Sequence, residues 1–163
     1  MNQLIIRISV HICAGFLLVA HFQSTEVIAQ RYNPSLERQL IREASSYEGR
    51  GNLAEAERIL RIVLSSNPTS DVGLLAAERI FREQGTLEEL LPLVDNYLEI
   101  NSGGAVARSL ALKVYQELGD LDNLKKSAED WLIVDGNKPE PYRKISEIFL
   151  EIYGEEEALE ILK

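Results

Sequence analysis

A fixed spacing of glycines recurs along the chain and constrains its fold more than any other feature of the sequence. Gly51, Gly85 and Gly119 stand at equal intervals of thirty-four positions, and Gly154 falls one position late. In frames of this length that begin at Glu37, one position is aromatic every time. Its four occupants are Tyr47, Phe81, Tyr115 and Phe149. A fixed period with recurring residue types predicts copies of one structural unit stacked on one another.

The residues within each period predict two helices joined by a tight turn. From Ser35 onward apolar residues recur at helical spacing, and no run alternates with the period of two of a half-buried strand. The recurring glycine can adopt the left-handed backbone conformation that ends a helix. Asn52 and Thr86 each precede a glutamate by three positions, the spacing of a capping box, and Asp120 can cap without one. The predicted fold is all-α.

Further positions of the frame predict how the two helices pack. The aromatic residue, one turn before the glycine, is expected to fill the space between the antiparallel helices. A second position in the second helix is alanine or leucine in every frame, namely Ala56, Leu90, Leu124 and Ala158. Pro92 falls inside the second helix of the second frame. Because proline lacks the backbone donor and clashes with the preceding turn, we expect a kink or a late helix start there.

With this period and these residues the chain resembles the tetratricopeptide repeat family, in an exported bacterial form. The resemblance implies a right-handed superhelical solenoid of antiparallel helix pairs, with about 3.5 repeats. It covers 37–163, as repeats 37–70, 71–104, 105–138 and an incomplete 139–163. Its signature residues are Tyr47, Gly51, Ala56, Pro68, Phe81, Gly85, Tyr115, Gly119, Phe149 and Ala158. The chain departs from the family pattern at Tyr97 and Trp131, where a small residue is typical.

The N-terminal segment, 1–29, is predicted to be a signal peptide. Arg7 precedes an apolar stretch at 8–22, which is shorter than the roughly 20 residues that span a bilayer. Val27 and Ala29 fit the −3 and −1 positions of a cleavage site, so we expect cleavage after Ala29 and a short segment, 30–36, before the repeats. The protein is thus expected to be periplasmic or secreted, or else held at the inner membrane by an uncleaved N-terminal segment.

Composition limits the chemistry of the predicted mature chain. His11, Cys13 and His21 are the only His and Cys residues, and all three lie within the predicted signal peptide. Thiolate or imidazole metal sites, cysteine nucleophiles and Ser-His pairs are therefore excluded, and we expect no enzyme activity and no cofactor. The net charge of −9 disfavours nucleic acid as a partner.

The family resemblance implies partner binding on the concave face lined by the first helix of each repeat. Seven cations fall there: Arg38, Arg42, Arg79, Arg82, Lys113, Arg143 and Lys144. They predict a protein or peptide partner that is acidic or presents a free C-terminal carboxylate. Alternatively, they pair with glutamates three or four positions away on the same solvated helix face. The carboxylate clamp of the family is not predicted, because its polar positions hold Ile41, Ser45, Ala76, Val106 and Leu110.

The predicted function is that of a non-catalytic scaffold or adaptor of the cell envelope. The alternative is an accessory repeat domain of a longer exported enzyme, such as a peptidase, whose catalytic part follows Lys163. An apolar face on the last predicted helix, formed by Ala158, Leu159, Ile161 and Leu162, favours a longer chain. We expect further repeats or a partner to cover that face, because a solenoid needs a polar cap.

The N-terminal residue of the purified protein tests the predicted export. In a bacterial host, the periplasmic protein is expected to begin at Gln30 by intact-mass measurement. Ala29→Tyr should block processing, because signal cleavage requires a small residue before the cut. Recovery of the uncleaved protein in the cytoplasm would contradict the predicted address.

Overall fold

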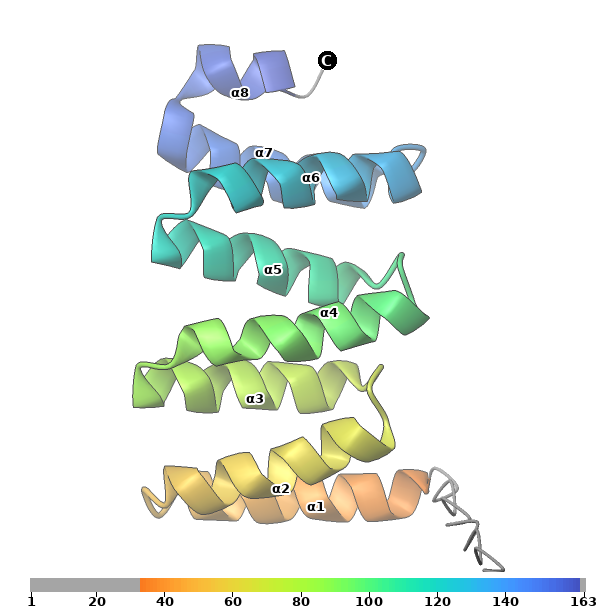
Figure 1. Cartoon of the computed structure of the whole chain (residues 1–163), viewed down its shortest axis with the longest axis vertical. Helices are drawn as coiled ribbons and strands as arrows, with labels where there is room; N and C mark the ends of the chain where they lie inside the picture. The colour runs from red at the N-terminus through yellow and green to blue at the C-terminus, as the bar shows by residue number, and fades with distance from the viewer. Residues whose placement is uncertain (1–32, 162–163) are drawn as a thin grey trace, which may run out of the picture.

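The computed structural model describes residues 33–161, which form short helices joined by tight turns (Figure 1). In chain order the elements are α1 (Pro34–Glu48), α2 (Leu53–Ser66), α3 (Asp71–Gln84), the 3-10 helix η1 (Leu87–Leu90), α4 (Leu91–Ile100), α5 (Ala105–Leu118), α6 (Leu121–Asp135), α7 (Pro139–Tyr153) and α8 (Glu155–Ile161). The predicted signal peptide, its cleavage site and 162–163 lie outside the described residues. Within the described range no strand is present, and the predicted all-α class is confirmed.

The helices stack in chain order along one long axis (Figure 1). Helices α1 and α2, then α5 and α6, pack as adjacent pairs, and α3 pairs with η1. The first helices also contact one another, α1 with α3, α3 with α5 and α5 with α7. Helix α1 starts at Pro34, so the first turn of the repeat array takes in residues that we expected to precede it.

Each helix pair turns at a glycine with a positive φ angle. The φ angles are 74° at Gly51 and Gly85, 68° at Gly119 and 81° at Gly154. No heavy atom lies within 4 Å of a Cβ built on any of these four glycines, so the backbone angle, and not crowding, demands the residue type. In the first three repeats, the amide after the glycine donates to the carbonyl of the repeat aromatic, at 2.9 to 3.0 Å.

The second helices begin in two different ways. Asn52 Oδ1 accepts from the Glu55 amide at 3.3 Å and Asp120 Oδ1 from the Asn123 amide at 3.2 Å, so both predicted caps are confirmed. The cap predicted at Thr86 is wrong, because its side chain makes no cap bond and the chain enters η1 there. Pro92 explains the difference: it lies in the first turn of α4, where a missing N–H costs no helix bond. The predicted late start is thereby confirmed.

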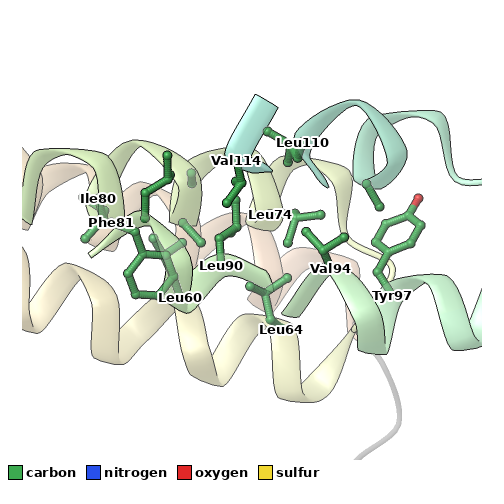
Figure 2. Close-up of a cluster of buried hydrophobic side chains, with 14 of the residues drawn as sticks. Leu60, Leu64, Leu74, Ile80, Phe81, Leu90, Val94, Tyr97, Leu110 and Val114 are labelled. Atoms are coloured by element: carbon green, nitrogen blue, oxygen red, sulfur yellow. The ribbon is translucent and has the colours of Figure 1, made fainter. Parts of the chain in front are cut away.

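The repeat positions supply the apolar core. Phe81 and Phe149 are at most 1% exposed, whereas Tyr47 and Tyr115 are half-buried. The second-helix position is buried in all four repeats, at Ala56, Leu90, Leu124 and Ala158. Figure 2 shows Phe81 and Leu90 among the side chains of the larger cluster, which spans α1 to α5. A second cluster spans α5 to α8, and Tyr115 packs against both.

One departure from the repeat pattern is accommodated by a glycine in the next turn. Tyr97 occupies the position of Val63 in the first repeat, is 4% exposed, and donates its hydroxyl to Asp71 Oδ1 at 2.7 Å. Burial and the Asp71 carboxylate raise the pKa of Tyr97 to about 12. A Cβ on Gly104 would lie 2.1 Å from Tyr97 Cε1, so the ring takes the space that a side chain would need.

This pairing of Tyr97 with Gly104 predicts a double-mutant result. Gly104→Ala should lower the free energy of unfolding by about 1–3 kcal/mol, because the methyl group overpacks the site. In a Tyr97→Val background the same change should cost less by at least about 1 kcal/mol, since the ring is gone. Denaturant unfolding of the four proteins measures the coupling, and simple additivity would contradict the explanation.

Candidate partner-binding surface

Helices α1, α3, α5 and α7 form one continuous layer, and their outward surface is called the first-helix face below. All seven predicted binding cations lie on these helices. Arg38 and Arg42 are on α1, Arg79 and Arg82 on α3, Lys113 on α5, and Arg143 and Lys144 on α7. The repeat frame therefore places them on the helices that we expected, although their neighbours differ.

Arg79 and Arg82 form ion pairs with glutamates of neighbouring repeats. The Arg79 guanidinium binds Glu48 of α1 through two bonds of 3.0 and 3.1 Å. Arg82 pairs with Glu78 on its own helix at 2.5 Å and with Glu117 of α5. The hydrogen bonds to these carboxylates raise the pKa of both arginines. Both cations are thus engaged within the protein.

The cations of α7 are paired along their own helix. Arg143 and Lys144 each lie 3.2 Å from Glu147, and Arg143 lies 3.9 Å from Glu140. The bond from Lys144 holds the pKa of Glu147 below its usual value. Arg38 donates to the Pro34 carbonyl at 3.2 Å. For Arg82, Arg143 and Lys144 the arrangement follows the alternative interpretation, in which each cation pairs with a glutamate three or four positions away on its own helix.

Arg42 and Lys113 differ, because within residues 33–161 neither makes an ion pair. Each lies at a surface depression between first helices. The first depression, about 300 Å³, is lined by Pro34, Glu37, Arg38, Ile41, Arg42 and Val72. The second, about 190 Å³, is lined by Leu75, Ala105, Val106, Ser109, Leu110, Lys113, Glu140 and Lys144.

Both depressions are largely apolar, which the charged residues of the sequence did not indicate. Val72 and Leu75 lie on α3 and are 59% and 43% exposed. Residues three apart share a helix face, so the two depressions adjoin along α3. Ile41, Val106 and Leu110 line them as well. Their aliphatic side chains at the clamp positions were the signal that could have revealed an apolar groove.

The first-helix face combines shallow depressions, exposed aliphatic side chains and cations. Within the described part of the chain, no group of three or more His, Cys, Asp and Glu side chains is arranged to hold a metal ion. None of the described helices is long and apolar enough to cross a bilayer. What the arrangement can do is bury aliphatic side chains of a ligand beside a cation.

No protein-family model matches the chain, and no curated protein matches it in sequence. Solved structures do match in shape. A tetratricopeptide repeat protein from Parabacteroides merdae is 20% identical with a TM-score of 0.54, over 74% of this chain and 48% of that one. MamA is 15% identical with a TM-score of 0.54, over 80% and 76% of the two chains. The chain has the tetratricopeptide-repeat fold.

A third match to this fold carries a ligand. The first tetratricopeptide repeat domain of Spaghetti (RPAP3), bound to the HSP90 peptide SRMEEVD, is 15% identical with a TM-score of 0.53. The match covers 76% of this chain and 98% of that one. The chain spans about half of the length of the Parabacteroides merdae protein.

The ion pairs between repeats are expected to contribute little stability. Arg79 is about half exposed, and exposed pairs are worth about 0–1 kcal/mol. Arg79→Gln should therefore lower the free energy of unfolding by less than about 1 kcal/mol, with a smaller effect in high salt. Phe81→Ala, the buried comparison two positions away, should cost about 3–5 kcal/mol. Similar losses for the two variants, measured by denaturant unfolding, would contradict this ranking.

Proposed function

We propose that this protein is a non-catalytic scaffold of the cell envelope that binds a peptide or protein segment on its first-helix face. The observation that carries the proposal is the pair of adjoining apolar depressions, each with a cation that has no ion-pair partner among the described residues. The ligand is a segment that combines aliphatic side chains with acidic residues or a C-terminal carboxylate.

The binding energy comes mainly from apolar burial. Covering Val72 and Leu75 removes exposed aliphatic surface from water, at about 25 cal/mol for each Å². Arg42 and Lys113 then select the acidic character of the ligand through charge-assisted hydrogen bonds at the rim. The ion pairs from Arg79 and Arg82 link neighbouring first helices, but they are exposed and are expected to add little to the binding energy.

The match to the peptide-bound RPAP3 domain supports a peptide ligand. The peptide in that complex, SRMEEVD, contains both acidic and aliphatic residues. The two chains share the fold at low sequence identity, and the apolar residues at the clamp positions of this chain favour a different register of ligand side chains. The proposed ligand class is thus similar, whereas the contacts are specific to this chain.

The proposed address in the envelope has a separate basis. It depends on the signal-like segment at 1–29, with its apolar stretch and the small residue before the cut.

Selection from a random-peptide display library tests the proposed groove. Peptides that bind the purified protein should combine aliphatic and acidic residues, because the face offers apolar depressions beside free cations. Leu75→Asp and Lys113→Glu should each weaken such a peptide by about ten-fold or more, measured by fluorescence anisotropy. Lys125→Glu is the matched control, because Lys125 is exposed on α6 and lines neither depression. Equal affinity in all four proteins would refute binding on this face.

A further inference from the structure

A polar cavity lies on the opposite side of α5 from the first-helix face. It has a volume of about 230 Å³ and is formed by side chains of α4, α5 and α6, three helices that follow one another in the stack (Figure 1). Arg108 and Tyr115 of α5 line it, whereas Val106 and Lys113 line the second depression of the first-helix face. Helical periodicity separates these two sets by about half a turn.

Arg108 is the unusual residue of this cavity. It is 9% exposed, and its Nε donates to the Ser102 carbonyl at 3.0 Å. Within the described residues no carboxylate is in ion-pair contact with it. Burial lowers the pKa of Arg108, against the smaller opposing influence of Asp130 and Asp135. A buried cation without a directly paired anion is costly, so its retention calls for a compensating role.

The preceding repeat has an apolar residue at the position of Arg108. Leu74 occupies the position of Arg108 one period earlier and is fully buried. A leucine there fills the core, and Leu40 stands at the same position in the first repeat. The third repeat therefore carries a charged side chain where the first two repeats have leucine, and the fourth has Tyr142.

The seam between neighbouring second helices also differs between the two repeats. Between α2 and η1, an ion pair of 2.6 Å joins Arg61 to Glu89, and Arg61 lies over the Phe81 ring. One period later the corresponding residues are Asp95 and Asn123, which cannot form that bridge. Both residues line the cavity instead. The seam between α4 and α6 therefore differs from the preceding one in two ways: it lacks the ion pair, and Arg108 replaces leucine at the same cavity.

We propose that this cavity is a binding site for a small zwitterion of amino-acid size, whose carboxylate pairs with Arg108. The charged side chains that line it balance, with Arg108 and Lys126 against Asp95 and Asp130. Arginine binds a carboxylate through two parallel hydrogen bonds, and an aspartate at the wall accepts from an ammonium group.

The two aspartates set the specificity. They repel a ligand that carries only negative charge, such as inorganic phosphate, and attract one that also carries an ammonium group. The volume is below that of typical drug-sized pockets, which start at about 300 Å³, so the site suits a single amino acid. Tyr115, half-buried at the wall, adds a hydroxyl that can donate or accept.

Titration of the purified protein with the standard free L-amino acids, by isothermal calorimetry and ligand-observed NMR, tests the site. At least one is expected to bind, and its N-acetyl and amide derivatives should bind about ten-fold or more weakly, because each lacks one charge. Failure of the whole panel to bind would overturn the proposal. Equal affinity of the N-acetyl form would overturn the assignment of a zwitterion.

The residues at the equivalent positions of the preceding repeat define the variants for this test. Arg108→Leu installs the residue of the preceding repeat, so the protein should stay folded at an unchanged or higher melting temperature while binding drops about ten-fold or more. The double variant D95R/N123E installs the bridge of the preceding seam and should abolish binding with Arg108 still present. Lys125→Leu, which removes the charge adjacent in sequence to the lining residue Lys126, should leave the affinity unchanged.

These outcomes are independent of the proposed peptide groove. Arg108→Leu should not alter capture of a peptide on the first-helix face, because Arg108 and Lys113 lie on opposite sides of α5. Retention of amino-acid binding in a folded Arg108→Leu protein would overturn the assignment of the carboxylate to this side chain.

Discussion

The whole array depends on the backbone reversal at the recurring glycines. Each places the second helix against the first, and in the first three repeats the next amide bonds back to the carbonyl of the repeat aromatic. Since one helix pair cannot bury its apolar side alone, the same reversal repeated at a fixed interval forces successive pairs into contact. The first-helix face and the seams between second helices are both products of that repetition.

Much of the fold could be predicted because the turn glycine and the aromatic position are local signals. The caps at Asn52 and Asp120 and the late start near Pro92 were predictable for the same reason. The cap at Thr86 was not, since Pro92, further along the chain, decides how the backbone enters α4. A short capping motif carries no information about that neighbour.

The surface was harder to predict than the fold. Sequence placed Arg79 and Arg82 on the correct helix, but their engagement depends on glutamates about one repeat away, and side-chain pairing across repeats has no short-range signature. Most of the cations predicted to bind a partner make intramolecular ion pairs or hydrogen bonds instead. The exposed aliphatic residues, Val72 and Leu75, carry more of the candidate surface than expected, since they lie between Arg42 and Lys113.

Helix α5 belongs to both apolar clusters, with Leu110 and Val114 in one and Leu112 in the other. It is therefore the shared wall between two cores. Unfolding of α6 to α8 would expose only the α5 residues of the second cluster, and α5 would still cover the core of α1 to α4. The two clusters are thus expected to unfold as separate units under thermal stress, with α5 as the boundary between them.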